Sequence, residues 1–169
     1  KLKQMYLNAY QSYLFNTWLS KRIEISKLVD GFEPKEIYES VGLPLEMVKQ
    51  MKQQAHPFKL LIGDVMSHYP FGKIFHVENI QEEAQKFYAQ DRVPTGILPG
   101  KKVKKSIDLA YEIEKPFDVE LNENGARRFA WVYPTEIESN YKEEKNWMEL
   151  SFSLPKGSYA TELISEIIH

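Results

Sequence analysis

The sequence has no cysteine among its 169 residues, which excludes disulfide bonds and thiolate chemistry. It also lacks any run close to the roughly 20 apolar residues that a membrane span requires, and it shows no secretory signal. These absences favour a cytoplasmic protein without a membrane partner. The net charge of −2 provides no overall attraction to nucleic acid, so any such binding has to rest on a local patch.

Several kinds of catalytic or cofactor site are missing as well. The four histidines do not pair at the spacing of a metal site, so we expect no bound metal. Neither a Walker sequence nor a dinucleotide fingerprint is present, which argues against a nucleotide cofactor. A Gly-x-Ser-x-Gly elbow is also missing, so a hydrolase triad is not expected around Ser158.

What the sequence does contain is typical of a globular protein. Aromatic residues make up 13% and hydrophobic residues 43% of the chain, enough to offset the entropy cost of ordering it. The length allows one domain, or one domain and part of a second. Because a helical pattern starts directly at Lys1, without an initiator Met, we expect a piece of a longer protein.

The first half of the chain predicts helices followed by strands. Apolar residues at helical spacing predict a helix over 5–23. Residues 34–54 predict two short helices with a break at Gly42–Pro44. Short apolar runs at 60–66 and 73–77, separated by a turn, predict two strands.

The second half predicts a mixture of short elements. Helices are expected over 82–90 and 106–114, and the intervening segment 91–105, with two Pro and two Gly, predicts an irregular loop. Strands are expected at 117–121 and 129–134.

The clearest strand is the last one, which alternates apolar and polar residues up to Leu154. Without a regular β-α-β rhythm, this mixture of short helices and strands favours an α+β fold.

Two groups of cations are candidate contacts for nucleic acid. The first is a lysine cluster beside the Pro- and Gly-rich loop, formed by Lys101, Lys102, Lys104 and Lys105. It is typical either of phosphate contacts or of a solvated face. The second is the pair Arg127 and Arg128, whose guanidinium groups suit either phosphates or acidic side chains at a domain seam.

Two further residues have both a functional and a structural interpretation. Asp64 is a candidate catalytic carboxylate, but a Gly-Asp before a strand more often forms a turn hydrogen bond. Tyr159 stands in LPKGSYATELISEII (154–168), where a strand gives way to a helix. Its ring either packs over the helix start or has a role in a binding site.

The segment 154–168 resembles the closing motif of the TruD-type tRNA pseudouridine synthases, in which Leu-Pro-x-Gly-Ser-(Phe or Tyr)-Ala-Thr leads into the final helix. Four other segments resemble the same family in the same order. They are YLNAYQSYLFN (6–16), GDVM (63–66), PTGILPG (94–100) and GARRFAWVYP (125–134). The resemblance therefore spans nearly the whole chain.

This resemblance implies an enzyme that isomerises a uridine of tRNA, at position 13 of the D arm, to pseudouridine without a cofactor. A base that is modified has to leave its stack, and Tyr159 is implied to stack on it. Seven cations are implied to contact the RNA backbone, namely Lys101, Lys102, Lys104, Lys105, Arg127, Arg128 and Lys156.

The chain departs from the family pattern in one respect. The family's catalytic Asp lies in a Lys-Asp-x-x-Ala type motif, and no Lys-Asp pair occurs here. We therefore expect a C-terminal half, with the entry helix and inserted domain at 1–133 and the last strand and helix of the catalytic domain at 134–169. Its expected partners are tRNA and the N-terminal half. The alternatives are a non-catalytic RNA-binding module of the same fold and a protein-interaction domain.

Overall fold

The computed structural model describes residues 2–155 and 157–168, and the chain divides into two compact units. Unit 1 comprises residues 1–130 and unit 2 residues 131–169. The elements are, in order, α1 (Leu2–Gly31), α2 (Pro34–Val41), α3 (Leu45–Lys52), β1 (Val65–His68), β2 (Ile74–His76), α4 (Ile80–Tyr88), β3 (Arg92–Leu98), α5 (Asp108–Glu114), the 3-10 helix η1 (Lys115–Phe117), β4 (Ala126–Phe129), β5 (Thr135–Lys142), the 3-10 helix η2 (Glu143–Lys145), β6 (Trp147–Ser153) and α6 (Ala160–Ile168). The α+β prediction is confirmed.

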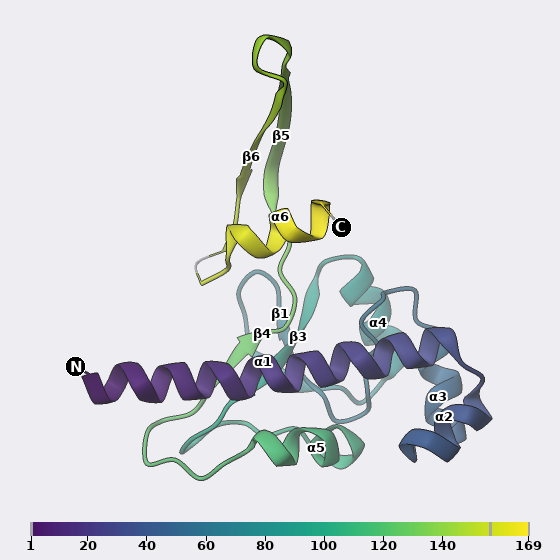
Figure 1. Cartoon of the computed structure of the whole chain (residues 1–169). Helices are drawn as coiled ribbons and strands as arrows, with labels where there is room; N and C mark the ends of the chain where they lie inside the picture. Colours follow the sequence, from purple (N-terminus) through teal and green to yellow (C-terminus); the bar gives the residue numbers. More distant parts are fainter. Residues whose placement is uncertain (1, 156, 169) are drawn as a thin grey trace. The chain divides into compact units, whose positions relative to one another are not determined.

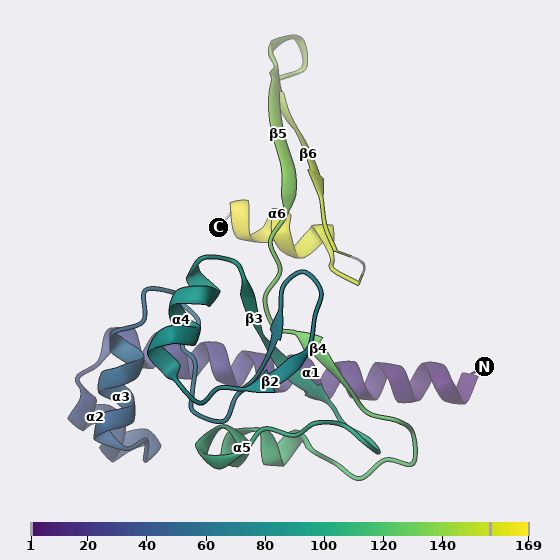
Figure 2. The ribbon, with the colours of Figure 1, turned by 180° about the vertical axis from the view of Figure 1, so that it is seen from behind.

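Unit 1 is built on a four-stranded antiparallel sheet in the order β2-β1-β3-β4. Helix α1 crosses one face of this sheet, in front of it in Figure 1 and behind it in Figure 2. Helices α2 and α3 pack against the C-terminal part of α1, and the predicted break between them is confirmed. Their apolar faces enclose a buried cluster made by Ile25, Val29, Ile37, Leu43, Val48, Met51, Leu61 and Ala110.

Helix α1 runs from Leu2 to Gly31 and is therefore longer than the predicted 5–23. The apolar spacing continues through Ile25 and Val29, but Arg22 interrupts it. Arg22 is buried because its guanidinium forms a bidentate ion pair with Asp64, which also accepts a hydrogen bond from the Leu61 N–H (2.8 Å). A charge inside an apolar helix face is tolerated only with such a partner.

The prediction of an irregular loop over 91–105 is wrong for its first half, which forms β3, one of the two inner strands of the sheet. The N–H and C=O of one strand residue point toward the same neighbour, and the Pro94 carbonyl accepts from Ala130 N–H just beyond β4 (2.9 Å). The donor that proline lacks is therefore not needed for pairing with β1. Gly96 is required by close packing, because a Cβ there would lie 2.3 Å from the Trp18 ring of α1.

Three other predicted strands differ from the structure. Strand β1 begins only at Val65, since residues 60–64 form the turn that presents Asp64 to Arg22. The predicted strand at 117–121 is wrong, because Asp118 instead receives a hydrogen bond from Lys105 and the segment pairs with no strand. The predicted strand at 129–134 is wrong beyond its first residue, because β4 covers Ala126–Phe129 and includes the Arg-Arg pair instead.

Unit 2 consists of the β5–β6 hairpin followed by helix α6. The predicted last strand is confirmed as β6, whereas its partner β5, with the sequence TEIESNYK, was not predicted. Within residues 131–155 and 157–168, every side chain keeps at least partial exposure. The described residues of unit 2 therefore form no buried core.

Candidate functional site

Residues 101–105, here called the lysine segment, follow β3 and are fastened at both ends by main-chain contacts. Lys101 N–H donates to the Glu123 carbonyl (2.8 Å), and its own carbonyl accepts from Gly125 N–H (2.9 Å). At the other end, the Ile107 N–H donates to the Gly63 carbonyl (3.0 Å). The segment lies outside the named helices and strands, as predicted, but its ends are fixed to the rest of unit 1.

The four lysines of this segment differ in their electrostatic surroundings. Lys101 and Lys102 are exposed, and neither forms an ion pair within the part of the chain that the structure describes. Lys105 donates to Asp118, and this hydrogen bond raises the pKa of the lysine. Lys104 borders a polar depression of about 450 Å³ whose lining includes three carboxylates, Glu78, Glu82 and Glu83. Lys101 and Lys102 are therefore the uncompensated charges available to an anion.

Arg127 lies inside unit 1 rather than on its surface. Its side chain is only 4% exposed and forms an ion pair with Glu114 (2.7 Å). It also donates to Thr95 and to the Lys104 carbonyl. Burial lowers the pKa of Arg127, although Glu114 opposes this shift. The Arg127 guanidinium is therefore hydrogen-bonded to acceptors of the protein. This agrees with the alternative in which the arginines pair with acidic side chains rather than with phosphates.

Glu114 is the partner that sequence reasoning missed, since one Glu in a short helix carries no distinguishing signal. It is fully buried and accepts hydrogen bonds from the Ser106 N–H (2.9 Å) and hydroxyl (3.0 Å). Together with Arg127 it holds the C-terminal end of the lysine segment against α5 and β4. A buried charge pair of this kind is costly to break from one side.

Arg128 projects from β4 on the face opposite Arg127, as alternation along a strand requires. Its guanidinium lies 5.1 Å from the centre of the Phe15 ring and donates to the Ser12 hydroxyl (3.1 Å). Both contacts are made to α1. The half-buried Arg128 therefore joins the helix to the sheet while part of its side chain stays accessible.

Tyr159 stands immediately before α6, at the turn that the sequence singled out. Its ring is 72% exposed, and its carbonyl accepts from the Glu162 N–H (3.2 Å) at the start of the helix. The backbone is thus held while the ring faces solvent, so packing over the helix start does not describe it. Lys156, the remaining predicted RNA contact, lies outside the described residues.

The other candidate groups are structural. Asp64 makes the turn hydrogen bond considered from the sequence and, in addition, the buried ion pair with Arg22. Among the described residues, no three His, Cys, Asp or Glu side chains are grouped so as to hold a metal ion. Likewise, within that part of the chain, no helix has the length and apolarity needed to cross a bilayer.

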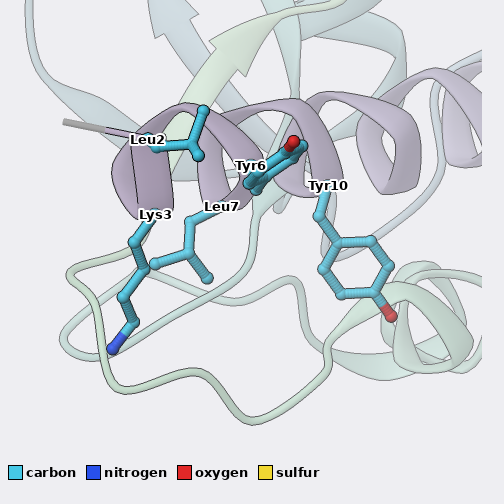
Figure 3. Close-up of a pocket in the computed structure, with 5 residues that line it drawn as sticks. All are labelled: Leu2, Lys3, Tyr6, Leu7 and Tyr10. Carbon is cyan, nitrogen blue, oxygen red and sulfur yellow. The ribbon is translucent and has the colours of Figure 1, made fainter.

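The first turns of α1 carry an apolar surface that the helix prediction did not anticipate. Leu2, Lys3, Tyr6, Leu7 and Tyr10 line an open depression of about 540 Å³ (Figure 3). Tyr6 and Tyr13 are well exposed on this helix, whereas Trp18 is buried. The signal was present in the sequence, because apolar residues occur on both sides of this stretch, which is typical of a helix covered on two sides.

Comparisons with known proteins identify the family. The family model described as tRNA pseudouridine synthase D (TruD) matches residues 1–167. The tRNA pseudouridine synthase D of Nitratiruptor sp. is 51% identical over 169 residues, and that of Sulfurimonas denitrificans 50% over 167 residues. Each alignment covers 99% of this chain and 47% of the relative, so the chain spans about half the length of these proteins.

The fold is also that of a solved relative. The crystal structure of a Methanosarcina mazei protein assigned to tRNA pseudouridine synthase D superimposes with a TM-score of 0.63, at 24% sequence identity. The match covers 98% of this chain and 38% of that one. The resemblance inferred from the sequence motifs is thus confirmed, and the chain belongs to the tRNA pseudouridine synthase D (TruD) family.

Proposed function

We propose that the chain is part of a cytoplasmic enzyme that isomerises a uridine of tRNA, at position 13 of the D arm, to pseudouridine. The observation that carries this proposal is the family match over residues 1–167, together with relatives named tRNA pseudouridine synthase D that share 50–51% sequence identity with this chain. In this reaction the bond between ribose C1′ and uracil N1 breaks and a bond from C1′ to C5 forms. The hydrogen on C5 is released to water, and no cofactor is consumed.

Tyr159 is proposed to stack on the uracil after it has left the RNA. A ring that is 72% exposed on a backbone held by the start of α6 supports this role. Stacking of a base on an aromatic side chain is worth roughly 1 to 3 kcal/mol. The ring can thus hold a detached uracil while it turns from N1 to C5, a step in which the base has no covalent attachment to ribose.

Backbone contacts to tRNA are proposed for the cationic groups of unit 1. Lys101 and Lys102 are the main contacts, since both are exposed without ion pairs among the described residues. Lys104, Lys105 and Arg128 contribute to the local positive charge. Arg127 is proposed to act indirectly by holding the Lys104 carbonyl. Lys156, which precedes Tyr159 by three residues in the sequence, stays in the proposed set.

The nucleophilic Asp is proposed to come from the other half of the family's length. The chain spans 47% of its relatives, and Asp64 is occupied by Arg22. We assign residues 1–133 to the entry helix and inserted domain, and 134–169 to the end of the catalytic domain. The apolar first turns of α1 (Figure 3) and the exposed apolar side chains of α6 support docking of an N-terminal half.

Release of tritium from tRNA labelled at uridine C5 tests the proposal. We expect release when the chain is combined with the N-terminal half, and none from either part alone. In the combined enzyme, Tyr159→Ala should lower turnover far more than tRNA affinity, whereas Tyr159→Phe, which keeps the ring, should retain most activity. Binding of tRNA without release in any combination would favour the non-catalytic RNA-binding module.

A further inference from the structure

A second aromatic side chain is displayed to solvent in unit 1, far along the sequence from Tyr159. Phe71 is 90% exposed at the hairpin tip, residues 69–73, that joins β1 to β2. Single exposed apolar side chains are common on protein surfaces, so exposure alone has no functional meaning. Phe71 differs from such residues in the rigidity of its support and in the charge around it.

The hairpin tip is held by hydrogen bonds and by close packing. His68 N–H donates to the Lys73 carbonyl (3.3 Å), and Tyr69 N–H donates to the Asp91 carbonyl at the start of β3 (3.0 Å). The proline ring at position 70 restricts the backbone before Phe71. After it, a Cβ at Gly72 would lie 2.5 Å from the His68 Cβ, so the turn closes more tightly than another residue allows. The Phe71 ring is therefore presented from a fixed backbone.

The surroundings of this ring favour an anionic ligand. Residues 65–77, which include both strands of the hairpin, contain Lys73 and two histidines but no Asp or Glu. The Arg92 guanidinium lies 5.8 Å from the centre of the Phe75 ring, at the same end of the sheet, but its Nε is 3.7 Å from a Glu83 carboxylate oxygen, so Lys73 is the cation of this end without an ion pair among the described residues. An aromatic face beside cations is the combination that binds bases and phosphates of single-stranded nucleic acid.

The position of the tip relative to the lysine segment indicates the size of the ligand. His68 pairs with Arg92 at the start of β3, while the lysine segment follows Leu98 at its end. Seven strand residues separate the two places by about 20 Å. A single nucleotide cannot reach both, whereas a folded RNA with an unpaired loop can.

We propose that Phe71 stacks on an unpaired base of the tRNA, at a site separate from the modified uridine. This inference rests on the proposed function, because it names an additional site on the same RNA ligand. Phe71 supplies stacking, and the exposed Lys73 supplies the neighbouring positive charge.

Binding of tRNA by the 169-residue chain over a range of salt concentrations tests this site. We expect Phe71→Ala to weaken binding about 5- to 150-fold without changing the salt dependence, since the phenylalanine ring neutralises no phosphate. Phe71→Trp should bind like the unchanged chain, and tRNA should quench the added indole beyond the change seen for the three native tryptophans. Phe71→Leu, which is apolar but not aromatic, should behave like Phe71→Ala.

Two control variants separate this inference from the proposed function. Phe32→Ala removes another exposed phenylalanine, 50% exposed and followed by Glu33, and should leave binding unchanged. Lys101→Ala with Lys102→Ala should reduce the salt slope by about 1 for each phosphate that the lysines neutralise. If that pair weakens binding but Phe71→Ala or Phe71→Leu does not, the stacking site is overturned and RNA binding stands. Failure of the unchanged chain to bind tRNA would overturn both.

Discussion

Units 1 and 2 of the chain differ in how their apolar side chains are used. All the buried hydrophobic side chains of the described residues lie between Leu14 and Ala110, in unit 1. Unit 2 has apolar side chains in α6 and β6 but buries none of them among residues 131–155 and 157–168. Unit 1 thus has a buried core like that of an independent domain. The described part of unit 2 has apolar side chains that could form a core, but they remain exposed or half-exposed. Stability of this chain should therefore depend on unit 1 alone.

The largest effect is expected from breaking the buried ion pair of unit 1. Asp64→Asn leaves the Arg22 guanidinium buried without its counter-charge, which should cost about 3–5 kcal/mol of unfolding free energy. Urea unfolding followed by circular dichroism measures this loss. Glu149→Gln, which removes an exposed pair with Lys142 in unit 2, is the matched control and should cost about 0–1 kcal/mol. Equal losses would contradict the distinction between the units.

A pH titration should produce the next largest effect. Burial lowers the pKa of His56 from 6.5 to about 4, and its Nδ1 accepts a hydrogen bond from Phe58 N–H (3.0 Å). Between these values the unfolded chain binds the proton and the folded chain does not. Stability is therefore complete above pH 6.5 and is lost as the pH falls, by about 1.4 kcal/mol at about pH 5.5 and about 2.5 kcal/mol at about pH 4.5.

His56→Asn tests this assignment, because the amide oxygen can still accept from Phe58 N–H but does not titrate. Its urea midpoint should vary less with pH between about 4.5 and 6.5 than that of the unchanged chain. An identical pH dependence in both proteins would show that other groups are responsible.

A smaller loss is expected at the contact between α1 and β3. Gly96→Ala places a methyl group against the Trp18 ring, and the resulting overpacking should cost about 1–3 kcal/mol. Gly31→Ala is the control, since no atom lies within 4 Å of the added Cβ. That change should be neutral or slightly stabilising. A loss at Gly31 as large as at Gly96 would mean that the effect is not one of packing.

The smallest effect is expected in α6. Ile167 is well exposed, so Ile167→Ser should change the unfolding free energy of the chain by no more than about 0.5 kcal/mol. The same variant should weaken docking of an N-terminal half, which a pull-down with that half would detect. A large loss of stability in the chain alone would contradict the view that unit 2 has no buried interior.

The sequence predicted elements well where one local pattern determines the structure. The break at Gly42–Pro44 and the alternation of β6 are such cases, because a helix stop and a period of two are local properties. The prediction failed at β3, because Pro94 and Gly96 are typical of loops. In the folded chain, Pro94 stands where its missing N–H is not needed for pairing with β1, and Gly96 stands where α1 leaves no room for a side chain. Local rules cannot anticipate which partner a residue will meet.

The candidate site shows the same limit. The exposed Tyr159 at a strand-to-helix turn could be identified from its motif. The lysines could be found in the sequence, but not separated into free and paired ones, because Asp118 and the carboxylates near Lys104 are distant in the sequence. Arg127 and Arg128 are neighbours in the sequence with opposite environments, which follows from their positions on the two faces of β4.

Helix α1 fixes the distance between its two ends within unit 1. Its 30 residues form one uninterrupted rod about 45 Å long, with its apolar first turns at one end and the Arg22 ion pair further along. A protein surface that binds the first turns of α1 is therefore held at a fixed distance and angle from the sheet that precedes the lysine segment. A one-residue insertion in α1 would turn everything beyond it by about 100° and so change the direction in which the first turns face.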